Sequence, residues 1–311
     1  MTTAFLTHPD CLGHITPSGH PERVERLEAI LARIDAPEFS GLDRIEAPLG
    51  TVDQVLLAHP LDYYRRIEAA IPDSGIVTLD ADTYLSPGTL NAALRGVGAA
   101  VKAVDLVLDG EADNAFCATR PPGHHAETST AMGFCMFGNV AIAAKHALQN
   151  RALDRVAIVD FDVHHGNGTQ DLVWNEPSIF FASTHQMPLY PGSGYPSEQG
   201  AHNNILNVPL NSGSDGSALI NAFRQSILPA VRRFKPELLL ISAGFDGHRD
   251  DPLAGLNFET SDFSEVTRLL CDFAAEACDG RVVSVLEGGY DLEALADSVA
   301  AHVKVLMEHD Q

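Results

Sequence analysis

The chain repeats one pattern: a short apolar run, a polar loop, and then a longer stretch with apolar residues at helical spacing. Apolar runs of four to seven residues predict strands at 115–118, 156–160, 178–183, 204–210, 238–242 and 282–286. Helical spacing predicts helices at 24–34, 52–70, 89–108, 139–148, 217–234, 261–278 and 292–307, with Thr89 capping the third. Buried strands alternating with amphipathic helices predict an α/β fold, with a mainly parallel sheet covered by helices on both faces.

Three of these strands end in the same way. The runs 156–160, 238–242 and 282–286 are each followed by a glycine-containing turn that carries Asp, His or Tyr. The carboxyl ends of parallel strands share one edge of a sheet, which is where open α/β folds bind ligands. We therefore expect the polar residues after these three strands to form one site.

The turn after 156–160 contains Asp160, Asp162 and His164, whose alternation along an extended chain places their side chains on one side. Two carboxylates and an imidazole on one face are unfavourable unless a cation holds them together. Oxygen and nitrogen ligands without a thiolate suit a divalent metal such as zinc. The simpler alternative is a strand-end aspartate that caps a turn and pairs with a histidine. Asp162, His164 and Asp246 form a plausible three-ligand set with coordination positions left open.

Adjacent His124 and His125 follow Arg-Pro-Pro-Gly, which holds their loop in a fixed, non-helical shape. These histidines are candidates for the base that activates a water molecule, with Asp160 and Asn167 available to orient one imidazole each. A carboxylate partner raises the proton affinity of a histidine, whereas an amide leaves it nearer its ordinary value. The alternative is a solvent-exposed polar turn.

Tyr290 follows 282–286 on a Gly-Gly turn and could donate its hydroxyl to a developing oxyanion. Packing as an ordinary aromatic side chain is the alternative. Arg23, at the start of the helix 24–34, is either a surface charge or an inward-facing arginine, and its position slightly favours the surface.

Composition limits the class of protein. The chain has 311 residues, 45% of them hydrophobic, and nothing resembling a linker or repeat, so we expect one domain over residues 1–311. Its 42 acidic and 20 basic residues give a net charge of −22, which disfavours nucleic acid and anionic membranes as direct partners. The same charge would attract cationic ligands, although acidic surfaces also serve solubility alone.

Five cysteines lie in mostly apolar surroundings without a Cys-x-x-Cys pair, as in proteins of a reducing compartment. The first residues lack a basic stretch and a sustained apolar stretch, and no segment approaches the roughly 18 apolar residues of a membrane span. We expect a cytoplasmic protein.

Five motifs resemble the zinc-dependent histone deacetylase superfamily, and most closely its class II and bacterial deacetylase-like amidohydrolases. They are Arg-Pro-Pro-Gly-His-His-Ala-Glu, Met-Gly-Phe-Cys, Val-Asp-Phe-Asp-Val-His-His-Gly-Asn-Gly-Thr-Gln, Ala-Gly-Phe-Asp and Glu-Gly-Gly-Tyr. The resemblance runs from His20-Pro-Glu-Arg to Tyr290. It implies a single-domain arginase–deacetylase fold with a mainly parallel sheet of about eight strands.

The resemblance also implies roles for individual residues. It assigns one catalytic zinc to Asp162, His164 and Asp246, and pairs His124 with Asp160 and His125 with Asn167. In this family the second histidine is generally taken as the main base and acid, and the tyrosine at position 290 stabilises the transition state. The implied substrate tunnel is lined by Gly133, Phe134, Tyr190, Leu253 and Gly288. A structural potassium ion is implied at Asp160, Asp162, His164, Ser183 and Thr184. The resemblance further places Arg23 in an internal cavity behind the metal.

The expected activity is zinc-dependent removal of acetyl or other short acyl groups from N-acyl-lysine in peptides or proteins. The alternative is an acylpolyamine or other small-molecule amide deacylase. Leu253 stands where polyamine-selective relatives carry a glutamate, which favours acyl-lysine. Gly88 stands where some relatives carry a serine that binds the peptide backbone, which leaves a small N-acyl amine open. A binuclear manganese hydrolase, a non-catalytic acyl-lysine binding module and a homo-oligomeric assembly are further hypotheses.

Overall fold

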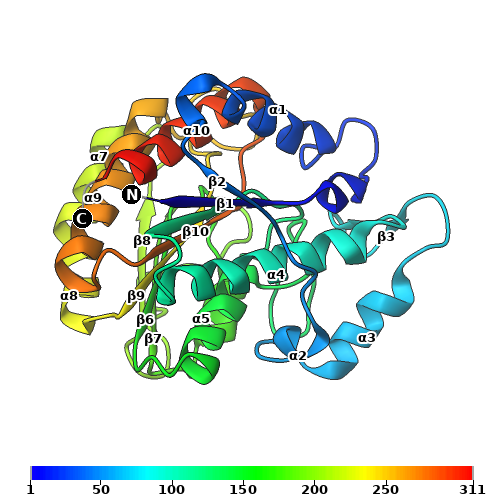
Figure 1. Cartoon of the computed structure of the whole chain (residues 1–311), viewed down its shortest axis with the longest axis horizontal. Helices are drawn as coiled ribbons and strands as arrows, with labels where there is room; N and C mark the ends of the chain where they lie inside the picture. Colours follow the sequence, from blue (N-terminus) through cyan, green and yellow to red (C-terminus); the bar gives the residue numbers. More distant parts are fainter. Residues whose placement is uncertain (1, 310–311) are drawn as a thin grey trace.

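The computed structural model describes residues 2–309, and so leaves residues 1, 310 and 311 of the predicted domain outside this range. Its centre is an eight-stranded sheet in the order β2-β1-β5-β10-β9-β6-β7-β8, and every neighbouring pair is parallel (Figure 1). The strands are β1 (Thr3–Thr7), β2 (Asp43–Glu46), β5 (Asn114–Cys117), β6 (Val156–Asp160), β7 (Ile179–Gln186), β8 (Ile205–Leu210), β9 (Leu238–Ala243) and β10 (Val282–Leu286). A small antiparallel pair, β3 (Val77–Thr78) and β4 (Tyr84–Leu85), stands apart from this sheet.

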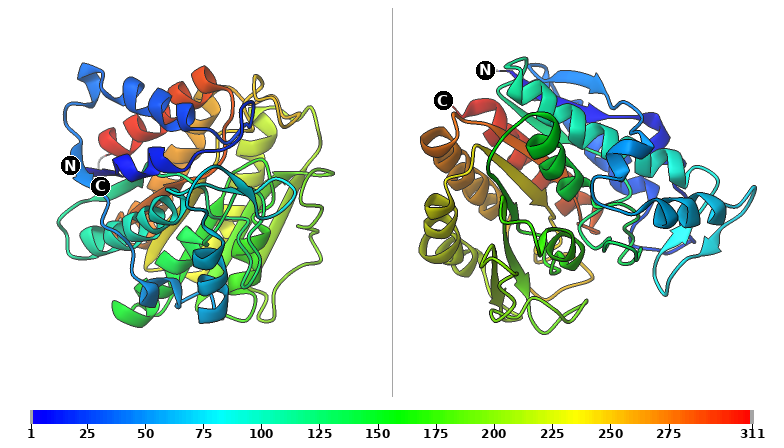
Figure 2. Two further views of the ribbon diagram at one scale, coloured as in Figure 1. Left: turned by 90° about the vertical axis from the view of Figure 1, so that its right-hand side faces the viewer. Right: turned by 90° about the horizontal axis from the view of Figure 1, so that it is seen from below.

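Helices cover both faces of the sheet, as the sequence predicts. The α-helices are α1 (Val24–Ile34), α2 (Val52–Val55), α3 (Leu61–Ala70), α4 (Thr89–Leu108), α5 (Asn139–Asn150), α6 (Asn167–Val173), α7 (Gly216–Ala222), α8 (Leu228–Phe234), α9 (Thr260–Ala277) and α10 (Leu292–Glu308). Figures 1 and 2 show α4 and α5 on one side of the sheet and α1 and α10 on the other. Within residues 2–309, no helix combines the length and the apolar character needed to cross a bilayer.

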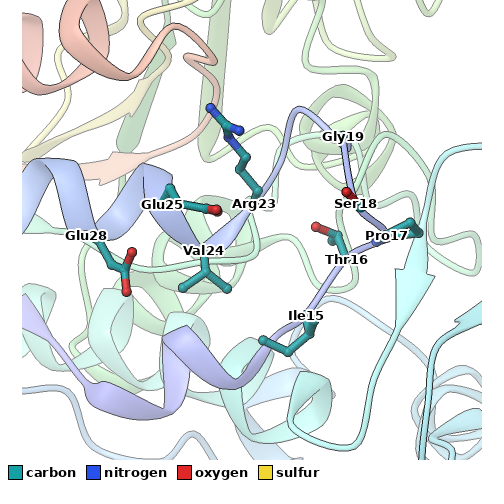
Figure 3. Close-up of a pocket in the computed structure, with 9 residues that line it drawn as sticks. All are labelled: Ile15, Thr16, Pro17, Ser18, Gly19, Arg23, Val24, Glu25 and Glu28. Atoms are coloured by element: carbon teal, nitrogen blue, oxygen red, sulfur yellow. The ribbon is translucent and has the colours of Figure 1, made fainter.

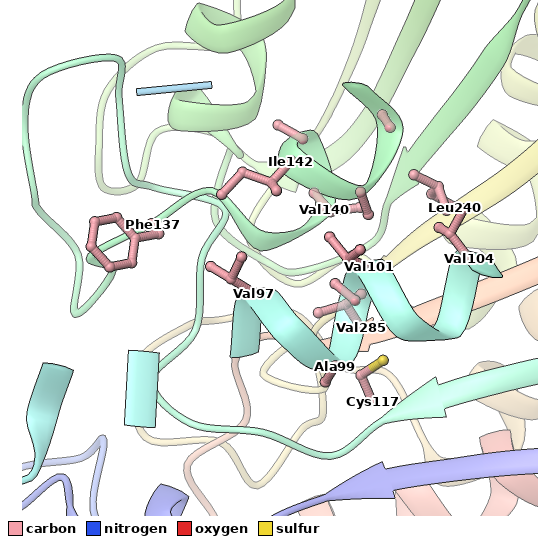
Figure 4. Packing of buried hydrophobic residues seen from close by; sticks show 14 of the residues in the cluster. Val97, Ala99, Val101, Val104, Cys117, Phe137, Val140, Ile142, Leu240 and Val285 are labelled. Atoms are coloured by element: carbon pink, nitrogen blue, oxygen red, sulfur yellow. The ribbon is translucent and has the colours of Figure 1, made fainter. Parts of the chain in front are cut away.

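Alternating strand residues build two separate cores. Val156 and Ile158 of β6 pack with α4 and α5, whereas Ala157 and Val159 pack with the helices of the opposite face. Figure 4 shows the first core, in which valines of α4 meet residues of α5 and of the strands. Strands buried on both faces must be apolar throughout, which explains why their runs are continuous in the sequence.

Three predicted elements differ in detail. The helix expected over 217–234 consists of α7 and α8 with a π-helical turn, Phe223–Ile227, between them. The helix expected over 52–70 is divided into α2 and α3, because Pro60 has no N–H to continue α2 and instead precedes α3. Thr89 is not the cap of α4: Gly88 precedes the helix, and the Thr89 hydroxyl accepts a hydrogen bond from the backbone N–H of Ser86 (2.8 Å).

The strand nearest the C-terminus joins the two halves of the sheet. β10 lies between β5 and β9, with Val283 beside both Ala115 and Leu240. The strands β10, β9 and β6 are consecutive in the sheet, so their carboxyl ends form one continuous edge. This arrangement places the turns after the three predicted strands side by side.

Candidate active site

Asp162 and His164 follow β6, and Asp246 follows β9, so two neighbouring strands supply the three predicted ligands. One ligand atom from each residue lies within 4.8 Å of the other two, and all three residues are buried. His164 Nδ1 lies 3.1 Å from Asp162 Oδ1 and 3.1 Å from Asp246 Oδ2. The structure therefore brings the predicted ligand set together.

The geometry of these atoms fits a divalent cation. Zinc bonds of about 2.0–2.1 Å in tetrahedral geometry separate ligand atoms by about 3.3–3.4 Å, close to the two distances at His164 Nδ1. The remaining carboxylate oxygens are held by the main chain: the N–H of Gly288 donates to Asp162 Oδ2 (2.8 Å) and that of Val163 to Asp246 Oδ1 (2.8 Å). Hydrogen bonds of this kind orient ligand side chains toward a metal.

Gly288, which the resemblance places in the substrate tunnel, lies against the carboxylates of two of the candidate ligands. A Cβ at this position would lie 2.1 Å from Asp246 Oδ2 and 2.5 Å from Asp162 Oδ2. Only a glycine lets the backbone approach both carboxylates this closely.

The charges at this site do not balance among the protein groups. Burial, and then the neighbouring Asp162 carboxylate, raise the pKa of Asp246. Burial raises the pKa of Asp160 to about 7 although His124 acts against it. Burial opposes the charge of His164, but Asp162 and Asp246 outweigh it and raise its pKa to about 10. A cation between the carboxylates would relieve their repulsion.

The tandem histidines have different partners. His124 Nδ1 lies 3.0 Å from Asp160 Oδ2, and His125 Nδ1 lies 2.7 Å from Asn167 Oδ1. Burial lowers the histidine pKa in both cases, but at His124 the Asp162 and Asp160 carboxylates outweigh it and raise the pKa well above its usual value. At His125, burial and the neighbouring His124 and His164 keep the pKa well below its usual value. The pair is therefore separated into one imidazole that binds a proton tightly and one that binds it weakly.

Asn167 determines which nitrogen of His125 carries the proton. Its Nδ2 donates to Glu127 Oε1 (2.8 Å) and to Met132 Sδ (3.4 Å), so its Oδ1 faces the imidazole as an acceptor. His125 Nδ1 must then be the donor, which leaves the lone pair of the neutral ring on Nε2. His125 is thereby prepared to accept a proton at Nε2.

A pocket of about 250 Å³ ends at these groups. It is lined by Asp82, His125, Gly133, Phe134, His164, Leu189, Tyr190, Leu253 and Tyr290. The aromatic walls stand edge-on to two of the candidate residues: ring centroids are 5.2 Å apart for Tyr190 and His125, and 5.9 Å apart for Phe134 and Tyr290. Four of the five predicted tunnel residues therefore line this pocket.

A family model described as Histone deacetylase domain matches residues 20–306. The chain belongs to the histone deacetylase family. It is 40% identical over 316 residues to "Histone deacetylase 10, chloroplastic" of Oryza sativa subsp. japonica, covering 95% of this chain and 71% of the relative. It is 37% identical over 294 residues to "Histone deacetylase-like amidohydrolase" of Pseudomonas aeruginosa, covering 92% and 75%. The crystal structure of the HDA15 HD domain matches with a TM-score of 0.93 at 33% identity, covering 98% of this chain and 88% of that one.

These comparisons confirm the predicted family and fold, and they place the chain in a hydrolase family with deacetylase activity. Its potassium residues remain a prediction. The sheet register sets Ser183 of β7 beside Asp160 of β6, and Thr184 follows, so the predicted residues are neighbours.

The buried arginine of α1 is Arg26 rather than Arg23, and the prediction that Arg23 lies in an internal cavity is wrong. Arg23 is half-buried and lines a hollow with residues 15–19 at the start of α1 (Figure 3). Arg26 is fully buried and donates to the backbone oxygens of Gly289 (2.6 Å) and Glu287 (2.6 Å). It precedes Ile30 and Ile34 by four and eight residues, so helical spacing could have identified it.

Sequence reasoning also missed two acidic residues of the candidate site. Glu287 Oε2 accepts the N–H groups of Gly123 (2.7 Å) and His124 (3.1 Å), and so fixes the tandem-histidine loop to the end of β10. Asp82 lines the pocket and accepts the N–H of Gly133 (3.2 Å). Gly88, by contrast, does not line this pocket. It packs so closely against the backbone of Gly13 that an added Cβ would lie 2.2 Å from the Gly13 carbonyl oxygen.

Proposed function

We propose that this chain is a zinc-dependent amidohydrolase that removes short acyl groups, above all acetyl, from N-acyl-lysine in peptides or proteins. The observation that carries the proposal is the buried Asp162–His164–Asp246 triad at the inner end of an apolar-walled pocket that His125 and Tyr290 also line. When bound, a zinc ion supplies Lewis acidity to an acyl carbonyl and lowers the pKa of a water molecule.

The pocket supports an extended acyl-amine as the substrate. Phe134, Leu189, Tyr190 and Leu253 form its walls, so the methylene stem of an acyl-lysine would displace water from apolar surface. The acyl group at the tip of that stem would then meet the polar inner end.

The chain's own groups divide the proton transfers. Neutral His125 takes a proton from the attacking water at Nε2, since its Nδ1–H is committed to Asn167. As the amide C–N bond breaks, the same Nε2 returns the proton to the leaving amine, which gives the free amine and a carboxylic acid. His124 stays protonated at Nδ1 against Asp160 and favours the negative charge that develops nearby.

Tyr290 serves as the hydroxyl donor to that developing oxyanion. Its ring is fixed between Phe134 and the Arg26 guanidinium, whose Cζ lies 4.9 Å from the ring centroid. Burial and the nearby Asp246 raise the pKa of Tyr290 well above its usual value, so the phenol stays protonated and able to donate.

Two further assignments belong to this proposal. We assign a structural potassium ion to the main-chain oxygens of Asp160, Asp162, His164 and Thr184 with the Ser183 hydroxyl, on the strength of the family resemblance. We also retain acylpolyamines as the second substrate candidate, because Asp82 places a carboxylate at the pocket that would attract a cationic amine.

The test compares wild-type protein with Tyr290→Phe on an acetyl-lysine peptide, acetylputrescine and acetylspermidine, with metal content measured for each sample. Tyr195→Phe is the matched control, since Tyr195 is 53% exposed. Loss of one oxyanion donor lowers kcat by about 100- to 1000-fold, so Tyr290→Phe should lose this much while keeping its zinc.

Other outcomes would reject parts of the proposal. A larger kcat/KM on the acetylated polyamines than on the peptide would show that small N-acyl amines, rather than peptides, are the preferred substrate. Two manganese ions per chain would indicate a binuclear hydrolase. If zinc-loaded protein hydrolyses no acyl-lysine, whatever the length of the acyl chain, the protein would instead be a non-catalytic acyl-lysine binding module.

A further inference from the structure

Asp251 lies beside the pocket but belongs neither to the metal triad nor to the histidine pairs. It sits in the loop between β9 and α9, is only 6% exposed, and donates its backbone N–H to His248 O (3.0 Å). Both oxygens of its carboxylate are used: Oδ2 accepts the N–H of Tyr290 (2.7 Å), and Oδ1 accepts the N–H of Leu253 (2.9 Å).

The two donors belong to different walls of the pocket. Leu253 comes from the same loop as Asp251, whereas Tyr290 follows β10, and both line the pocket. One buried carboxylate therefore joins an apolar wall to the tyrosine that donates to the oxyanion.

The backbone before Tyr290 needs such an anchor. Tyr290 follows Gly288 and Gly289, and Gly289 has a φ of +121°, a conformation open to glycine but rarely to other residues. Arg26 Nε holds the carbonyl oxygen of Gly289 (2.6 Å) on one side of this turn, and Asp251 holds the N–H of Tyr290 on the other. Without the second contact, only the packing of the ring against Phe134 and Arg26 would hold the direction of the tyrosine side chain.

We propose that Asp251 is a positioning residue that directs the Tyr290 hydroxyl into the pocket and fixes the position of Tyr290 relative to Leu253 in the other wall. This inference rests on the proposed function, in which Tyr290 is the donor. A carboxylate is required because both backbone N–H groups need an acceptor, and an amide offers one acceptor oxygen and a competing NH₂ donor.

The experiment is a double-mutant cycle with Asp251→Asn and Tyr290→Phe, measured as kcat and KM on an acetyl-lysine peptide with zinc-loaded protein. A misplacement of about 1 Å costs up to about 100-fold in rate, so Asp251→Asn should lower kcat by about 10- to 100-fold. In the Tyr290→Phe background, the same substitution should lower kcat less than about threefold, because the hydroxyl through which it acts is already absent.

Asp250→Asn is the matched control, because the neighbouring Asp250 side chain is 64% exposed, and it should keep the wild-type kcat. Asp251→Glu, which retains both acceptor oxygens, should restore part of the rate lost in Asp251→Asn. If Asp251→Asn does not fold, the comparison is made on the smaller loss of kcat in Asp251→Glu, which should appear only in the background that retains the Tyr290 hydroxyl.

An equal loss of kcat in both backgrounds would show that Asp251 acts on the fold or the metal rather than through Tyr290, and would overturn the inference. An unchanged kcat in Asp251→Asn would overturn it as well. Absence of turnover in zinc-loaded wild-type protein and in Asp250→Asn would instead reject the proposed function itself.

Discussion

Replacing Gly288 with alanine tests how strongly the metal site depends on close approach by the backbone. The new Cβ would lie 2.1 Å from Asp246 Oδ2 and 2.5 Å from Asp162 Oδ2, whereas a carbon–oxygen contact needs about 3.3 Å. Carboxylates or backbone must therefore move by about 1 Å, and metal sites tolerate about 0.2 Å in their bond lengths. Because two of the three ligands are displaced, we expect zinc affinity to fall at least about 100-fold, or about 2.7 kcal/mol.

The assay is competition for zinc against a chromogenic chelator, followed by turnover at saturating zinc. Gly41→Ala is the matched control, because its Cβ would meet only Met307 Cε, at 3.5 Å. Zinc binding by Gly288→Ala within a few-fold of wild type would refute the reasoning, whether or not turnover changes.

Two further substitutions and one labelling experiment have predictable outcomes. Asn167→Asp gives His125 a carboxylate partner and raises its pKa, so the acidic limb of the kcat/KM profile should move up by about 1 pH unit or more; an unmoved limb would argue against His125 as the base. Burial lowers the pKa of His302 to about 3, so the unfolded chain takes up the proton first and stability falls as pH drops from about 6.5 toward 3. In urea unfolding, His302→Gln should therefore lose about 2 kcal/mol less than wild type between pH 7 and pH 5, and an equal loss would contradict this assignment. All five cysteine thiols are buried, so a thiol reagent should react slowly with the native protein and should label all five thiols once the protein is unfolded. Rapid labelling of the native protein would contradict the burial of these thiols.

The central strands could be predicted because their burial is complete. Every residue of Val156–Asp160 and Val282–Leu286 is buried, so these strands appear in the sequence as uninterrupted apolar runs. The edge strand β2 was missed because its sequence, Asp-Arg-Ile-Glu, is largely exposed and carries three charges. Pairing with β1 makes it a strand, and no local pattern contains that information.

The same distinction applies to the site. The three candidate metal ligands could be predicted because each follows an apolar strand within a few residues, and the sheet brings the ends of those strands together. The supporting contacts could not, because they join distant segments: Arg26 and Glu287 are 261 residues apart, and Tyr290 and Asp251 are 39 apart. Such contacts depend on how loops close over the sheet edge, which helical or strand periodicity does not report.

The central position of β10 in the sheet determines the order in which parts of the sheet can form while the chain is being synthesised. During synthesis, β1, β2 and β5 and the group β6 to β9 are complete before the strand that separates and joins them exists. A ribosome-bound chain that has not yet released residues 282–286 can hold Asp162, His164 and Asp246, but it lacks Gly288 and Tyr290 above them. The enzyme should therefore become competent only once β10 and the turn after it have been made, and a chain that stops before residue 282 should form two unjoined half-sheets rather than a smaller hydrolase.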